Sequence, residues 1–309
     1  MEFGADARPD WPGTARWGSR FGGYQHTRIG DTHRGDSAYS STGACNPRRT
    51  PPGTIHVMRP GVNWFHPRIR EAFNASDELV TEIPLQEFED AQALLVQRAI
   101  TDDGLPLTEH LDAAQLSLYR RAMGRLRIPV AMFEVTEPWV PTFLLMSGTP
   151  SGSPYRAEIG VERILARAAR DRRMATSGLE SLDMQFGFFD NLSMETQVSM
   201  LMDLSRAIVE PCRCAGRRGG IDALVNMWAA GDVDSLAAAN VADATEEPAE
   251  FHQVLLPDRN DRSSQWIQLR LNEPGGKFFV AVGAAHLAGD ESVQSFLARD
   301  GITAERIEY

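Results

Sequence analysis

The chain has 309 residues, 42% of them hydrophobic and 24% charged, which is enough for one large globular domain or two modest ones. Its formal net charge of −11 argues against nucleic-acid binding, because contacts with phosphates require a basic surface. No apolar stretch approaches the roughly 18 to 20 residues that span a bilayer. The N-terminus also lacks the apolar core of a signal peptide.

The first part of the chain differs in composition from the rest. Residues 1–50 are dominated by Gly, Arg, Ser, Asp and Thr and show no apolar periodicity, so we expect them to be disordered or to result from a wrongly assigned start. Pro47, Pro51 and Pro52 precede Gly53, and proline lacks the N–H group that a central strand needs. The first strand of the domain, which we place at 51–309, is therefore predicted to be missing or atypical.

The next elements follow from the spacing of apolar residues. A helix over Pro67–Asn74 is followed by a strand whose apolar residues are Leu79, Val80 and Ile83. A mainly helical insertion is then predicted over about 86–235. Ser193 is a plausible N-cap for one of its helices. The predicted helices of this insertion cover 88–99, 113–127, 161–173, 194–209 and 221–230.

Several arginines gather on one of these predicted helices. Arg163, Arg167 and Arg170 share the side opposite Ile164, Leu165 and Ala168. An anion-binding patch is one interpretation, but this spacing favours a solvated helix face.

The chain ends in a predicted strand–helix–strand unit. Phe278–Val282 is an apolar run typical of a buried strand, an amphipathic helix covers Ser292–Arg299, and a closing strand covers Ile302–Ile307. Together the elements predict an α/β fold, with a mixed central sheet, flanking helices and the helical insertion in the middle.

Two similar tetrapeptides stand near the two ends of the predicted domain. They are Gly53-Thr54-Ile55-His56 and Gly283-Ala284-Ala285-His286, and the second follows the predicted strand Phe278–Val282. A strand can carry a histidine to the edge of a sheet, and a glycine allows a sharp turn or the close approach of a ligand. For either histidine alone, a packing or capping role would be the favoured interpretation. The ordered pair favours a shared site.

Further segments match one family in the same order along the chain. Gly53–His56 and Gly283–Gly289 resemble the GTIH and GAAHLAG motifs of GumN-like bacterial proteins, and Arg259-Asn260 resembles their RN pair. In the middle, Gly178–Gln185 resembles GLET-x-x-EQ, and the stretch containing Leu224, Trp228 and Ala230-Gly231-Asp232 resembles AW-x-x-GD. The chain thus resembles the TraB/PrgY/GumN family, which is similar to the Tiki metalloproteases and more remotely to erythromycin esterases and ChaN haem-binding lipoproteins.

The resemblance implies a set of site residues. His56, His286, Glu82 and Glu180 would surround a divalent metal ion, since imidazole and carboxylate ligands together suit Mn, Co or Zn. Glu82 and Glu180 are also the candidate catalytic acids or bases. For each of the two a plainer interpretation stays open: exposed strand charge for Glu82, and a partner of the helix dipole for Glu180.

Arg259 and Asn260 complete the candidate catalytic set. They could stabilise an oxyanion or clamp a substrate carboxylate. A loop ion pair among Asp258, Arg259, Asp261 and Arg262 is an equally good interpretation.

The implied function is a metal-dependent hydrolase, in particular a peptidase, acting on a peptide or small-molecule substrate. The sequence contains no Gly-x-Ser-x-Gly elbow, His-Glu-x-x-His helix or phosphate-binding Gly-x-x-x-x-Gly-Lys loop. Two alternatives come from the same relatives: capture of haem or another tetrapyrrole, and non-catalytic blocking of a peptide signal. As written the chain is expected in the cytoplasm. An export signal missing from its start would place it in the periplasm or envelope.

Overall fold

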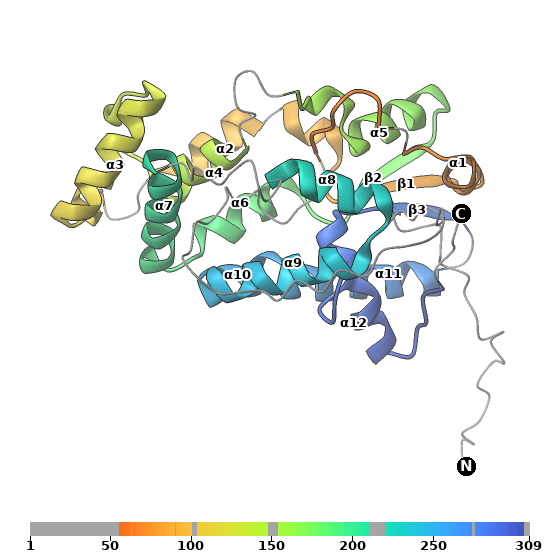
Figure 1. Cartoon of the computed structure of the whole chain (residues 1–309). Coiled ribbons are helices and arrows are strands. Elements are labelled where there is room, and N and C mark those ends of the chain that lie inside the picture. Colours follow the sequence, from red (N-terminus) through yellow and green to blue (C-terminus); the bar gives the residue numbers. More distant parts are fainter. Residues whose placement is uncertain are drawn as a thin grey trace, which may run out of the picture.

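The computed structural model describes residues 56–62, 64–89, 91–100, 104–147, 154–210, 220–273 and 276–305. Within them, β1 (Glu78–Thr81), β2 (Ala175–Gly178) and β3 (Phe278–Ala281) form a sheet of order β2-β1-β3 (Figure 1). Both pairings are parallel, and Thr81 at the end of β1 lies opposite Gly178 and Ala281. All three strands therefore end at the same edge of the sheet.

The predicted α/β class with flanking helices is confirmed, with two differences in the sheet. The described strands are all parallel, whereas we expected a mixed sheet. Ile302–Glu305, the described part of the predicted closing strand, is not in a strand. Ile302 instead packs against the apolar cluster under β3. The expectations for residues 1–50 and for the strand before Gly53 lie outside the described residues.

Helices cover both faces of the sheet (Figure 1). On one face, Leu79 and Phe279 pack with α1 (Pro67–Asn74), α5 (Val161–Asp171) and α8 (Gly220–Ala230). On the other, Val80 and Val280 pack with α11 (Pro257–Asn272) and α12 (Val293–Arg299). Successive strand residues thus enter different cores, because side chains alternate along a strand.

A helical body extends the molecule away from the sheet (Figure 1). Its core contains Tyr119, Trp139 and Phe186. Strand β2 and helix α5, which belong with the sheet, interrupt the range of about 86–235 over which we expected the insertion. The helices of this body are α2 (Ala91–Ala99), α3 (Ala113–Leu126), α4 (Trp139–Ser147), α6 (Leu182–Asp190), α7 (Met194–Val209) and α10 (Ala249–Leu255).

Local signals explain where several elements begin and end. The Ser193 side chain accepts a hydrogen bond from the Thr196 N–H, so it caps α7 as predicted. Asp112 and Gln115 form a capping box at the start of α3. Arg163, Arg167 and Arg170 are exposed along α5, as a solvated face requires. The remaining elements are α9 (Val233–Glu246) and the short 3-10 turns η1 (Leu85–Glu89), η2 (Leu107–His110), η3 (Val130–Phe133), η4 (Ala157–Ile159) and η5 (Ala284–Leu287).

None of the helices in the described part of the chain combines the length and the apolar character needed to cross a membrane.

Candidate functional site

Three predicted site residues follow the three strands at one edge of the sheet. Glu82 comes directly after β1, Glu180 comes two residues after β2, and His286 lies in η5, which follows β3. The Glu180 N–H donates to the Glu82 carbonyl over 2.9 Å, so the segments that follow β1 and β2 stay adjacent beyond the ends of the strands. The carboxyl edge of a parallel sheet is where ligands bind in α/β folds.

Arg259 joins the two carboxylates. Its Nη2 donates to Glu82 Oε2 over 2.8 Å and to Glu180 Oε2 over 2.9 Å, and its Nε donates to Glu180 Oε1 over 2.8 Å. Arg259 is 6% exposed and lies in the first turn of α11. It therefore belongs to a buried ion-pair network with Glu82 and Glu180, and not to the loop ion pair with Asp258 and Asp261.

Glu180 is fully engaged by this network. Gln185, which belongs to the segment resembling GLET-x-x-EQ, donates its Nε2 to Glu180 Oε2 over 2.9 Å. The start of α6 is capped by Ser181, whose side chain accepts from the Met184 N–H. The carboxylate of Glu180 thus serves Arg259 and Gln185, while the helix has another cap.

Asn260 holds His286. The Asn260 Nδ2 group donates to the Glu291 carbonyl over 2.6 Å, and a carbonyl can only accept, so Asn260 Oδ1 is the atom 2.5 Å from His286 Nδ1. The Nδ1 atom of neutral His286 therefore carries the proton, and the lone pair is on Nε2. In metal sites, a hydrogen bond of this kind from the other ring nitrogen fixes the tautomer of the histidine ligand.

The Nε2 atom of His286 is buried and has no hydrogen-bond partner. It lies 3.8 Å from Glu82 Oε1, and His286 as a whole is 3% exposed. The Gly283 N–H donates to the same Glu82 oxygen over 2.6 Å. A buried polar atom without a partner is costly, so this one marks the place in the network where a further group would fit.

The network separates the pKa values of its members. Burial alone would raise the pKa of Glu82, but His286, Arg259 and His56 lower it to about 2. Burial together with Arg259 lowers the pKa of His286 to about 4, against the opposing effect of Glu82. Burial also acts to lower the pKa of Arg259, but Glu82 and Glu180 outweigh it and raise that pKa. At neutral pH His286 is uncharged, so Arg259 is the cation that keeps Glu82 ionised.

The low pKa of His286 predicts a loss of stability in mild acid. The His286 side chain takes up a proton at about pH 6.5 in the unfolded chain but only at about pH 4 in the folded chain. The stability that the neutral side chain contributes is therefore complete above pH 6.5 and is lost as the pH falls towards 4. The loss approaches about 3 kcal/mol. Urea unfolding between pH 7 and 4.5 should show it in the wild type, and His286→Gln should flatten the curve. Parallel curves for the two proteins would contradict the buried neutral imidazole.

His56 lies near this network on a different element. Its side chain is 62% exposed, and its Nδ1 lies 3.6 Å from Glu162 Oε2 in the first turn of α5. Partial removal of His56 from water acts to lower its pKa, but the negative charge of Glu162 outweighs this effect and raises the pKa. His56 is close enough to interact electrostatically with both Glu82 and His286. The charge of each predicted histidine therefore affects the pKa of Glu82, and the charge of His56 affects the pKa of His286.

Gly160 allows the His56 segment to approach α5. A Cβ atom at position 160 would stand 2.1 Å from the His56 carbonyl oxygen, far inside van der Waals contact. We therefore expect Gly160→Ala to shift His56 and to destabilise the protein by roughly 1 to 3 kcal/mol in urea unfolding. Gly124→Ala is the matched control. Gly124 lies in α3 with nothing within 4 Å of an added Cβ, so this change should stabilise by up to about 1 kcal/mol. Effects of the same sign would refute the close approach.

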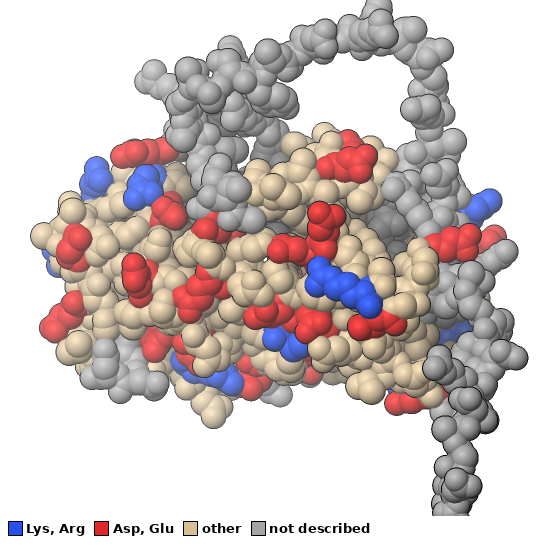
Figure 2. All heavy atoms as spheres, turned by 90° about the horizontal axis from the view of Figure 1, so that it is seen from below, with Lys and Arg blue, Asp and Glu red and all other residues tan. Residues whose placement is uncertain are grey.

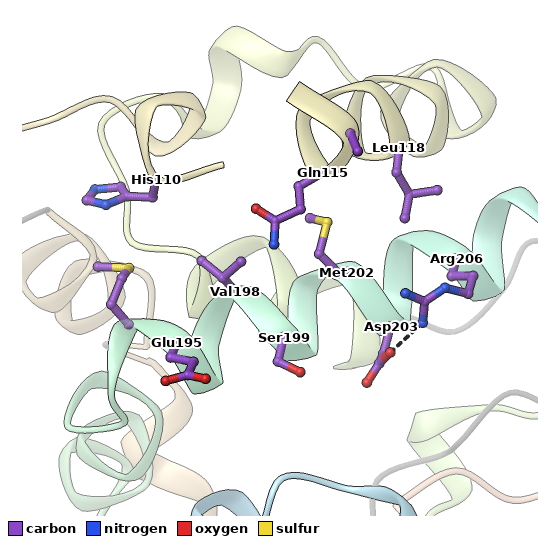
Figure 3. A pocket seen from close by; sticks show the side chains of 11 residues that line it. His110, Gln115, Leu118, Glu195, Val198, Ser199, Met202, Asp203 and Arg206 are labelled. Atoms are coloured by element: carbon purple, nitrogen blue, oxygen red, sulfur yellow. Dashed lines mark hydrogen bonds and ion pairs between the residues drawn. The ribbon is translucent and has the colours of Figure 1, made fainter. Parts of the chain in front are cut away.

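A hollow lies away from this network, between α3 and α7 (Figure 3). It has a volume of about 590 Å³ and is lined by apolar side chains such as Leu118, Val198 and Met202, with His110 at one end. An ion pair of 2.7 Å joins Asp203 and Arg206 at its rim. None of its lining residues belongs to the network of Arg259, so the hollow is separate from that site.

Sequence reasoning missed Glu162. Its position in a first helical turn is typical of a helix-dipole partner, and no motif that we identified contains it. The spatial proximity of His56 is the signal that reveals it. By contrast, Asp232 of the segment resembling AW-x-x-GD has a local structural role, because its Oδ1 accepts from the Ser235 N–H in the first turn of α9.

Comparison with known proteins agrees with the motifs. Searches of curated proteins and of solved structures give no significant match. The model of the TraB/PrgY/gumN family matches residues 52–306, which include both Gly-x-x-His tetrapeptides and every strand described above. The chain therefore belongs to the TraB/PrgY/gumN family.

Proposed function

We propose that this protein is a metal-dependent hydrolase that acts on peptides, with its ion at the carboxyl edge of the sheet. The observation that carries the proposal is the buried, unpartnered Nε2 of His286, which lies 3.8 Å from a carboxylate oxygen of Glu82. With Nδ1 held by Asn260, the lone pair on Nε2 is oriented before any ligand arrives.

The donor set fits a divalent transition metal ion. His286 Nε2 and Glu82 Oε1 are two ligand atoms of the types that Mn, Co and Zn accept, and His56 is the natural third. Among the described residues, no three His, Cys, Asp or Glu side chains converge into a complete metal site, so His56 would have to draw closer on binding. Glu180, which we expected as a ligand, is better assigned to holding Arg259.

Each residue then has a distinct task. A bound divalent ion would polarise the scissile carbonyl and lower the pKa of a water molecule. Glu82, with a pKa of about 2, is a weak base and is better suited to holding an ion than to accepting a proton. Arg259 keeps Glu82 ionised, and Asn260 keeps the lone pair of His286 on Nε2.

The substrate is proposed to be a peptide or another small molecule rather than a nucleic acid. Acidic side chains outnumber basic ones over the face shown in Figure 2, in line with the net charge of −11. Such a surface repels a phosphate backbone.

The test is peptide cleavage by the full chain after removal and return of metal. The stripped protein should cleave no member of a mixed peptide library, and addition of Mn, Co or Zn should restore cleavage that mass spectrometry detects. His286→Ala should remain inactive with every ion. Cleavage that survives chelation, or a folded metal-loaded protein without hydrolytic activity, would contradict the proposal.

The haem-binding and peptide-blocking alternatives are tested with the same preparation. A Soret band in the visible spectrum of purified protein would favour tetrapyrrole capture, whereas a colourless protein with stoichiometric Mn or Zn would favour hydrolysis. Tight binding of a peptide without cleavage would favour the blocking function.

A further inference from the structure

We propose that Glu162 is the positioning residue for His56, in the way that Asn260 is for His286; this inference rests on the proposed function of the same site. Glu162 Oε2 lies 3.6 Å from His56 Nδ1, and the residue is 8% exposed. The distance is within ion-pair range although it is longer than a hydrogen bond.

The Glu162 carboxylate is under-bonded where it stands. Its other oxygen, Oε1, is buried and has no hydrogen-bond partner. A buried carboxylate oxygen without a hydrogen bond is costly to keep, so a donor that moves closer to Glu162 would be favoured. The imidazole of His56, whose Nδ1 is already within ion-pair range of Oε2, is such a donor.

The backbone brings this pair together. Gly160 is the N-cap of α5, and the absence of its side chain lets the His56 carbonyl approach the helix start. Glu162 is two residues further along, in the first turn of α5, and its Oε2 lies within ion-pair range of His56 Nδ1. A hydrogen bond from Nδ1 to Glu162 would place the lone pair of neutral His56 on Nε2, the arrangement that Asn260 enforces on His286.

A purely structural role for Glu162 predicts different results. A carboxylate in the first turn of a helix can be a favourable partner of the helix dipole, and its removal would then lower stability without affecting His56. A positioning role predicts that an apolar residue at 162 leaves the stability of the metal-free protein unchanged or higher, while the ring of His56 loses its orientation.

The test compares Glu162→Leu, Glu162→Gln and the control Glu158→Leu in the metal-free full chain. Glu158 is exposed and lies nearby in η4. The nitrogen-15 shifts of the His56 ring, read at about pH 8.5 where an ordinary imidazole is neutral, report which nitrogen carries the proton. The wild type and Glu158→Leu should carry it on Nδ1. Glu162→Leu should move it largely to Nε2, and Glu162→Gln, which keeps an acceptor, should retain it on Nδ1.

Calorimetric titration with Mn²⁺ and Zn²⁺ separates this inference from the proposed function. Glu162→Leu should bind either ion roughly 10-fold to 100-fold more weakly than the wild type, and Glu158→Leu should bind it equally well. A wild type that binds neither ion, with a His56 proton that still depends on Glu162, would refute the proposed function and support the contact. The same His56 tautomer in the wild type and in Glu162→Leu would overturn the positioning role. If Glu162→Leu does not fold, Glu162→Ala takes its place, and a His56 proton that stays on Nδ1 in that variant would overturn the positioning role.

Discussion

Replacing Arg259 by Met should destabilise the protein by about 3 to 5 kcal/mol, because Glu82 and Glu180 would stay buried without their cation. At roughly 2 to 4 °C for each kcal/mol, the melting temperature should fall by roughly 6 to 20 °C. The measurement is thermal or urea unfolding of the metal-free chain. A substrate-facing arginine would instead affect activity and leave stability nearly unchanged.

Two further variants sharpen this result. Arg163→Met removes an exposed guanidinium from α5 and should change stability by less than about 0.5 kcal/mol. Adding Glu180→Gln to Arg259→Met removes one of the two buried carboxylate charges left without a cation and should restore part of the lost stability. An Arg259→Met protein as stable as Arg163→Met would show that the buried network contributes nothing, and the assignment of Arg259 would fail.

Replacing His286 by Ala should weaken the binding of Mn²⁺ or Zn²⁺ roughly 100-fold or more, because the buried Nε2 lone pair is removed. Asn260→Ala, which acts through that histidine, should weaken binding by roughly 10-fold to 100-fold. The affinity is measured by calorimetric titration of the stripped protein.

His110→Ala is the control for this series. His110 lines the hollow between α3 and α7, whose lining contains no residue of the network around Arg259. Its replacement should leave metal affinity unchanged. Equal losses for His110→Ala and His286→Ala would show that the affinity reports general damage to the fold and not a ligand.

Much of the fold was predictable where apolar periodicity is strong. Helix α7 has the predicted bounds Met194–Val209, and β3 covers most of the predicted strand Phe278–Val282. Strand β2 was missed because Ala175–Gly178 is a half-exposed edge strand with no apolar alternation. Its existence depends on pairing with β1, which local sequence does not encode.

The candidate site was predictable as a set of residues but not as a set of contacts. Glu82, Glu180, Arg259, Asn260 and His286 do gather at one edge of the sheet, because each follows a strand or begins the helix packed against it. A single sequence could not show which basic side chain forms an ion pair with which carboxylate. Arg259 lies 177 residues from Glu82 along the chain, and only the tertiary fold makes them partners.

Anomalous X-ray diffraction from crystals of the wild-type protein soaked in Mn²⁺ tests the proposed metal centre most directly. The predicted result is one strong peak within coordinating distance of His286 Nε2 and Glu82 Oε1, which disappears in His286→Ala. A map without a peak at this edge of the sheet, or with manganese only among exposed acidic side chains elsewhere, would contradict the proposal that His286 and Glu82 hold a catalytic ion.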